Sequence, residues 1–190
     1  MLKIIAEFDP DDVLPFIGKV GTPKKEYIVG ETTLSLKMTS LRLRTFKASR
    51  QCVICGLFGT KVLLEQFEGS CSSRPHFNLY GEGTPSNIYR SHAVSPEKSG
   101  LILFTKDHVL PKSKGGQNNL ANMQSMCVIC NGLKANSMFG NKGMKLLRKF
   151  YDENIGLDNS ELLKELSIKR KAITADVQKK EKEKRRCPCR

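Results

Sequence analysis

The sequence predicts an α+β fold in which strands come first, helices follow, and a bound metal ties distant parts of the chain together. Three observations favour this fold: short apolar runs of strand character, two distant Cys-x-x-Cys pairs, and a Lys/Arg-rich helical pattern towards the C-terminus. The chain has 190 residues, of which 39% are hydrophobic and none is Trp. That length leaves room for one domain with appendages, and the modest core would gain from a metal.

The N-terminal segment, residues 1–39, carries 5 basic and 6 acidic side chains, and we assign it no function. Apolar runs and polar–apolar alternation predict strands in it. The predicted strands are residues 2–8, 25–29 and 33–38. Directly after this segment, Leu43 and Phe46 stand at helical spacing, which indicates a short helix before the first Cys pair.

The central part, residues 40–141, has the order strand, strand, loop, helix. The predicted strands are residues 61–67, 76–80 and 101–105. The last of them is an apolar run that delivers Asp107 and His108 at its end. Gly, Pro and Ser make residues 81–99 a long connection, and a polar loop follows at residues 111–119. A helix is expected to start at the second Cys pair.

Two Cys-x-x-Cys pairs are the most specific metal signal in the chain. They are Cys52–Cys55 and Cys127–Cys130. Two such short loops can supply four thiolates to one tetrahedral Zn²⁺ ion. Buried thiol pairs or redox sites are the alternative, but the paired spacing favours a structural zinc in the reducing cytoplasm. The remaining cysteines, Cys71, Cys187 and Cys189, receive no role.

The net charge of +13 is concentrated after residue 39. Residues 40–141 carry 12 basic and 5 acidic side chains, and residues 142–190 carry 15 and 8. A basic body with a basic tail favours a polyanionic partner, and we expect nucleic acid, with a solvated charged helix as the plain alternative. Apolar runs of the ~20 residues that span a bilayer are absent from the sequence, so no membrane partner is expected.

The C-terminal part, residues 142–190, is predicted to be helical and basic. Asp158 and Glu161 fit a capping box at the start of a helix. Its apolar residues fall near one helical face: Leu162, Leu166, Ile173 and Val177. The helix is therefore either docked on the domain or a partner chain, or a free basic arm.

Several residues of the central part closely resemble the HNH, or ββα-metal, endonuclease motif. They are Asp107, His108, Asn122, Asn131 and Lys134, together with the second Cys pair. The loop at residues 111–116 is similar to that of many members, and residues 75–81 are similar to a version found in bacteriophage HNH endonucleases. The resemblance implies a ββα-metal nuclease domain over residues 40–141. It also implies the cytoplasm of a bacterial cell, with or without phage infection, as the place of action.

The resemblance also implies a role for each motif residue. His108 would be the general base, because a neutral imidazole near pH 7 accepts a proton readily. Asp107 and Asn131 would hold a catalytic Mg²⁺ or Mn²⁺, for which hard oxygen ligands are suited. Asn122 would brace the loop that positions His108, and Lys134 would contact phosphate. The expected DNA contacts are Lys112, Lys114, Lys134, Lys179, Lys180, Arg185 and Arg186.

The sequence thus predicts an enzyme that hydrolyses DNA phosphodiester bonds with a divalent ion. One site cuts one strand at a time, so a monomer would nick, and a double-strand break would need a homodimer or two visits. Two alternatives stay open: a zinc DNA-binding module without catalysis, and a structure-specific resolvase or ribonuclease that uses the same motif.

Overall fold

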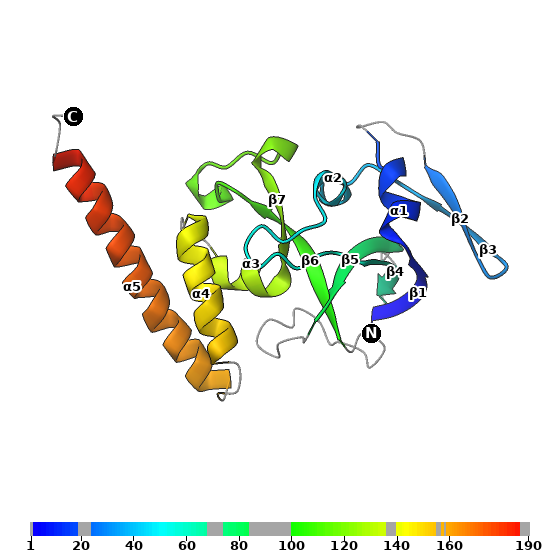
Figure 1. Ribbon diagram of the computed structural model, residues 1–190. Coiled ribbons are helices and arrows are strands. Elements are labelled where there is room, and N and C mark those ends of the chain that lie inside the picture. Colours follow the sequence, from blue (N-terminus) through cyan, green and yellow to red (C-terminus); the bar gives the residue numbers. More distant parts are fainter. Residues whose placement is uncertain are drawn as a thin grey trace.

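A five-stranded antiparallel sheet forms the centre of the computed structural model, which describes residues 2–18, 24–67, 74–83, 100–135, 140–154, 157 and 159–186. The strand order in the sheet is β1-β4-β5-β6-β7. The five strands are β1 (Leu2–Phe8), β4 (Lys61–Phe67), β5 (His76–Glu82), β6 (Leu101–His108) and β7 (Met123–Cys127). A separate hairpin of β2 (Lys25–Val29) and β3 (Thr32–Leu36) projects from one end of the molecule (Figure 1).

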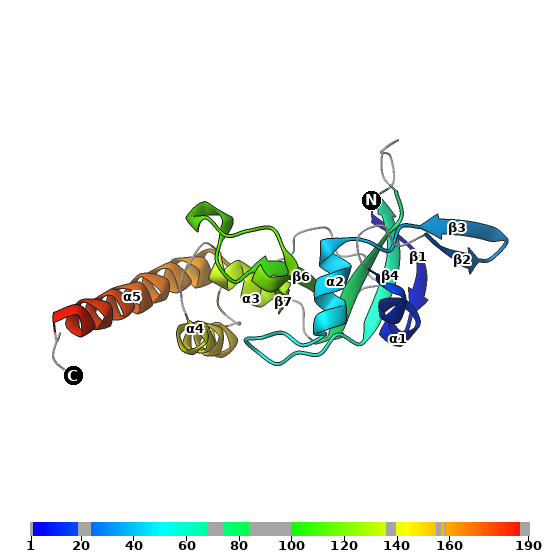
Figure 2. The same ribbon diagram turned by 90° about the horizontal axis from the view of Figure 1, so that it is seen from above.

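Helices lie beside and beyond this sheet. They are α1 (Pro10–Val13), α2 (Leu41–Ala48), α3 (Val128–Lys134), α4 (Asn141–Glu153) and α5 (Asn159–Arg186), with 3₁₀ turns η1 (Leu14–Phe16), η3 (Lys112–Lys114) and η4 (Leu120–Asn122). Figure 2 shows α3, α4 and α5 together at the end of the molecule opposite to the hairpin. Within the described residues, the search for a helix long and apolar enough to cross a membrane finds none.

The predicted α+β class is confirmed, and its ββα part is formed by β6, β7 and α3. β6 and β7 pair antiparallel, with Phe104 opposite Cys127 and His108 opposite Met123. The chain then enters α3, whose N-terminal cap is Cys127. The strand β7 escaped prediction because Met, Gln and Ser give little strand signal. Its pairing with β6, rather than local propensity, makes it a strand.

The helix α2 fixes the first Cys pair to this unit. The Ser40 hydroxyl caps it by accepting a hydrogen bond from the backbone N–H of Leu43 at 3.1 Å. Phe46, fully buried, meets the ring of Phe104 on β6 edge-on at 6.4 Å. After α2, the hydroxyl of Ser125 on β7 donates to the carbonyl of Ser49 at 2.6 Å. The loop that follows Ser49 is therefore held directly against β7.

The N-terminal segment shares the central sheet, because β1 pairs with β4 along its length. Tyr27 of the hairpin packs against the central sheet, because its ring meets the ring of Phe77 on β5 edge-on, with 5.1 Å between the ring centroids. Burial raises the pKa of Tyr27 to about 12. The division into segments 1–39, 40–141 and 142–190 stays a prediction, and hydrogen bonds between strands cross its first boundary.

The first half of α5 packs against the rest of the protein. This agrees with the docked helix, one of the two alternatives that the sequence left open. Its residues Leu162, Leu166 and Ile173 are buried in the same apolar cluster as Leu147 and Tyr151 of α4. The guanidinium of Arg170 donates to the carbonyl of Leu133 at 2.9 Å. Figure 1 shows the last turns of α5 running away from the sheet. The capping residue Asp158 lies outside the described residues, as do Cys71, Cys187, Cys189 and most of the connection 81–99.

Candidate functional site

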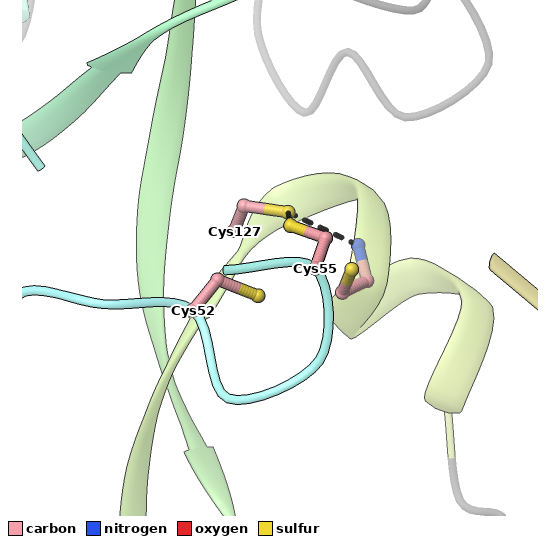
Figure 3. A group of neighbouring side chains, drawn as sticks. Cys52, Cys55 and Cys127 are labelled. Atoms are coloured by element: carbon pink, nitrogen blue, oxygen red, sulfur yellow. Dashed lines mark hydrogen bonds between the residues drawn. The ribbon is translucent and has the colours of Figure 1, made fainter. Parts of the chain in front are cut away.

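The four cysteines of the two pairs converge, as their spacing predicted. All four sulfur atoms lie within 4.8 Å of one another, and Cys55 Sγ is 3.8 Å from Cys127 Sγ. A tetrahedron with Zn–S bonds of ~2.3 Å has edges of ~3.8 Å, so the cluster has the size of a metal-binding site. In Figure 3, Cys52 and Cys55 come from the loop before β4, and Cys127 comes from the end of β7.

Two turns aim the sulfur atoms at one another. In the first, the N–H of Gly56 bonds the carbonyl of Cys52 at 3.0 Å, and Gly56 has a φ of 76°, which glycine adopts without strain. In the second, Cys127 Sγ accepts from the N–H of Cys130 at 3.4 Å at the start of α3. Each Cys-x-x-Cys pair therefore presents both of its thiols from one tight turn.

The cluster needs positive charge. Contact with Cys127, and then with Cys130, lowers the pKa of Cys55 to about 7, whereas contact with Cys127 raises the pKa of Cys130. Four neighbouring thiols cannot all ionise unaided, and a dication removes this conflict by binding four thiolates. Arg148 of α4 adds further compensation, because its Nη1 lies 3.3 Å from Cys130 Sγ and 3.7 Å from Cys127 Sγ. The donor set therefore fits a thiolate-bound metal ion.

A second polar group lies at the end of β6. Asp107 is buried, and its Oδ2 accepts two hydrogen bonds. Lys134 Nζ of α3 donates from 2.8 Å, and Gln124 Nε2 of β7 donates from 2.8 Å. The Lys134 ammonium also donates to the carbonyl of His108 at 2.7 Å. The bonds recorded in the described part of the chain all go to Oδ2, and Oδ1 receives none.

His108, the predicted base, is half-buried at the last position of β6. Its ring nitrogen Nε2 is inaccessible in this conformation and has no hydrogen-bond partner among the described residues. A buried polar atom without a partner is rare in native proteins, and a catalytic role is one of its explanations. Asp107 and His108 thus combine an unbonded carboxylate oxygen with an unbonded imidazole nitrogen.

Asn122 braces the loop after His108, as the resemblance implied. Its Oδ1 accepts from the N–H of Leu110 at 2.8 Å, and its Nδ2 donates to the carbonyls of Leu110 and Gln117 at 3.0 and 2.9 Å. Its own carbonyl accepts from the N–H of Val109 at 3.0 Å. Gly116 completes the turn, because a Cβ there would lie 1.8 Å from the carbonyl oxygen of Leu110.

The other predicted site residues fall into three groups. Asn131 is half-buried on α3, three residues before Lys134 and hence on the same helical face. Lys112 and Lys114 are exposed on the braced loop, and Lys179 and Lys180 are exposed on α5. The side chains of Arg185 and Arg186 lie outside the described residues. Nothing in these positions tests the predicted DNA contacts.

Lys134 is buried, although the sequence analysis expected it to contact phosphate. A phosphate contact requires an accessible ammonium, but the Lys134 side chain is only 6% exposed and both of its recorded partners belong to the protein. In this conformation the ammonium therefore bonds protein groups, and its predicted contact with phosphate stays a prediction. The long lysine side chain passes inward along α3 because a buried carboxylate, Asp107, needs a counter-ion.

Comparison with known proteins identifies this part of the chain. Residues 101–147 match the HNH endonuclease family. This HNH segment covers about a quarter of the chain and contains β6, the braced loop, β7, α3 and the start of α4. The match confirms the resemblance and indicates nuclease activity in general. Neither the curated proteins nor the solved structures contain a match to the chain.

Two residues of the HNH segment and its surroundings were missed by sequence reasoning. Gln124 carries no motif signal, but it stands opposite Asp107 in the β6–β7 pair. Arg148 lies in a basic helix among other cations, so its contact with the thiols could not be distinguished from surface charge. In both cases the missing information was a neighbour distant in the chain.

Proposed function

We propose that this protein is a metal-dependent endonuclease that hydrolyses DNA phosphodiester bonds. The observation that carries the proposal is the pair at the end of β6, inside the HNH segment. There, in the part of the chain that the structure describes, His108 Nε2 has no partner and the adjacent Asp107 has one oxygen without a hydrogen bond. The family match supports a nuclease, and this pair supports hydrolysis at that position.

His108 is the proposed general base. An imidazole nitrogen that bonds no protein group can accept the proton of an attacking water molecule once the ring exposes that nitrogen to the substrate. The peptide group that follows His108 is fixed at both of its polar atoms, because its carbonyl accepts from Lys134 and its N–H, that of Val109, donates to the carbonyl of Asn122. This arrangement fixes the backbone that carries the ring at the strand end, and it leaves Nε2 without a hydrogen bond to a described residue.

Asp107 and Asn131 are the proposed holders of Mg²⁺ or Mn²⁺. Asp107 Oδ1 and the amide oxygen of Asn131 are hard donors, which these ions prefer over thiols and imidazoles. Such an ion, when bound, would supply Lewis-acid stabilisation of the phosphate that is cut. The position of Asn131 one turn from Lys134, which touches Asp107, supports the pairing of the two donors.

The braced loop and the tail are the proposed DNA contacts. Lys112 and Lys114 extend into solvent from the turn that Asn122 holds, next to His108 in the chain. Lys179 and Lys180 are exposed on the part of α5 that follows its docked half. Exposed cations of this kind contact phosphates without reading bases.

The four thiols are the proposed structural zinc site. The burial of Cys52, Cys127 and Cys130, the spacing of all four sulfur atoms and the neighbouring Arg148 fit a four-thiolate site, which keeps no open position for chemistry. We propose that the protein works in the reducing cytoplasm, where thiols stay free. One catalytic site per chain supports nicking by a monomer, and a homodimer would cut both strands.

A plasmid assay tests the proposal. Purified protein is incubated with supercoiled plasmid in Mg²⁺, in Mn²⁺ and in EDTA, and the expected result is nicked circles with either metal and none with EDTA. DNA binding without cleavage would instead favour the non-catalytic zinc module. Cleavage restricted to RNA or to branched DNA would favour the ribonuclease or resolvase alternative.

A further inference from the structure

We infer that Lys134 and Gln124 are positioning residues that fix the carboxylate of Asp107 so that only its Oδ1 is presented to the catalytic ion. The inference rests on the proposed function, in which Asp107 holds a divalent ion. It assigns Lys134 a different role from the phosphate contact that the sequence suggested, and it gives Gln124 a role for the first time.

The first support is the geometry at Asp107. Lys134 Nζ and Gln124 Nε2 both donate to Oδ2 at 2.8 Å, and they come from different elements, α3 and β7. Two donors from different directions on one oxygen fix the rotation of the carboxylate group, and they determine which of its two oxygens is used as the acceptor. The oxygen that remains is Oδ1, so Asp107 is set up as a ligand through a single oxygen.

The second support is burial. The side chains of Lys134 and Asp107 are 6% and 10% exposed, and an ion pair removed from water to this degree is maintained only by good geometry and further hydrogen bonds. Lys134 has such a bond, to the carbonyl of His108 at 2.7 Å. One ammonium thus links α3 to the carboxylate of Asp107 and to the backbone of the proposed base.

The third support is the sheet register. Asp107 and Gln124 are directly opposite each other in the β6–β7 pair, so the sheet itself sets the distance between their side chains. The amide of Gln124 also contacts the sulfur of Met126 at 3.7 Å, which limits its rotation. Groups that orient a metal ligand from behind typically change metal affinity or activity by about 10–100-fold when removed.

The test uses zinc-loaded full-length protein and two variants, Lys134→Met and Gln124→Met. Mn²⁺ binding is measured from the paramagnetic resonance signal of free Mn²⁺, and nicking rates are measured against Mn²⁺ and against DNA concentration. We expect both variants to need about 10–100-fold more Mn²⁺ for half-saturation. The DNA concentration for half-maximal rate should stay at the wild-type value, because neither side chain would touch phosphate.

Matched variants control for charge and for folding. Lys164→Met removes an exposed lysine from α5 and should leave Mn²⁺ affinity unchanged. Lys134→Met leaves a buried carboxylate without its counter-ion, so its melting curve is recorded. If that variant does not fold, Gln124→Met, which removes no charge, decides the question by itself.

Two results would overturn the inference. Tighter Mn²⁺ binding by Lys134→Met would mean that the lysine competes with the ion. Unchanged Mn²⁺ binding with a raised DNA requirement would mean that it contacts phosphate after all. Failure of the proposed function looks different: wild-type protein would then bind no Mn²⁺, or Asp107→Ala would bind it as well as the wild type does.

Discussion

The thiol cluster and the end of β6 differ in how far the chain satisfies its own polar groups. At the thiol cluster, four sulfur atoms from two turns face one another, with Arg148 beside them. At the end of β6, Gln124 and Lys134 hold Asp107 and His108, yet no hydrogen bond from a described residue reaches Asp107 Oδ1 or His108 Nε2. A closed set of donors suits a structural ion, and an open set suits chemistry on a substrate.

The helix α3 connects the two regions. It begins at Cys127, includes Cys130, and ends at Lys134, the residue that bonds Asp107 and His108. A metal at its N-terminus would therefore fix the start of the same short helix whose last residue bonds the proposed catalytic pair at the end of β6. We expect loss of the metal to affect both regions, whereas changes at His108 should affect catalysis alone.

The largest expected effect is that of Cys127→Ser, which removes one ligand. Zinc binding contributes about 10–16 kcal/mol in small zinc domains, which exceeds the total stability of many domains. We predict loss of bound zinc and of the cooperative melting transition, measured by metal analysis and calorimetry. Cys71→Ser, outside both Cys pairs, is the control and should retain one zinc per chain. A fully zinc-loaded Cys127→Ser protein with unchanged melting would refute the four-thiolate site.

The next effect is that of His108→Ala. Loss of a general base lowers rates by about 10²–10⁴-fold, and we predict this decrease in plasmid nicking with unchanged DNA binding and melting temperature. His76→Ala on β5, outside the HNH segment, should nick at nearly the wild-type rate. If His108→Ala nicks plasmid at the wild-type rate, His108 is not the general base. The end of β6 would then no longer differ from the thiol cluster as a site of chemistry.

A smaller effect is expected from Asn122→Ala, which removes three hydrogen bonds to the loop after His108. Misplacement of a catalytic group by about 1 Å can cost about 10²-fold in rate, so we predict a decrease of that order. Asn118→Ala changes an exposed residue of the same loop and is the matched control. Equal rates for the two variants would show that the brace does not position His108.

The smallest effect concerns the tail. Removal of residues 158–190 would strip buried Leu162 and Leu166 from the core, so the cut belongs after Val177, beyond the docked half of α5. If the removed part neutralises about 3 phosphates, the slope of log affinity against log salt should flatten by about 2.7.

The cleavage rate at low salt should remain near that of the full chain. A full-length variant with Lys179, Lys180, Lys182 and Lys184 changed to Gln separates the effect of charge from that of length. A lower melting temperature with an unchanged salt slope would assign this part of α5 to docking rather than to DNA.

The sequence by itself predicted which four cysteines come together, and it predicted the residue types at the proposed site of chemistry. Cys-x-x-Cys spacing is local, so it predicts a turn that presents two thiols wherever the turn lies in the fold. The residue types Asp107, His108 and Asn122 likewise restrict their possible roles, and the contacts of Asn122 agree with the brace predicted for it. Apolar periodicity predicted most strands and the helical character of the C-terminal part.

Only the tertiary structure decided where the long side chains point and which segments pair. From its place on α3, the Lys134 side chain could extend into solvent or into the interior. It extends inward because its ammonium forms an ion pair with the buried carboxylate of Asp107. β7 is a strand because it pairs with β6 through backbone hydrogen bonds. α5 packs on the domain because its apolar residues contact the apolar face of α4. These outcomes depend on contacts between residues far apart in the chain, which local patterns of residue type do not contain.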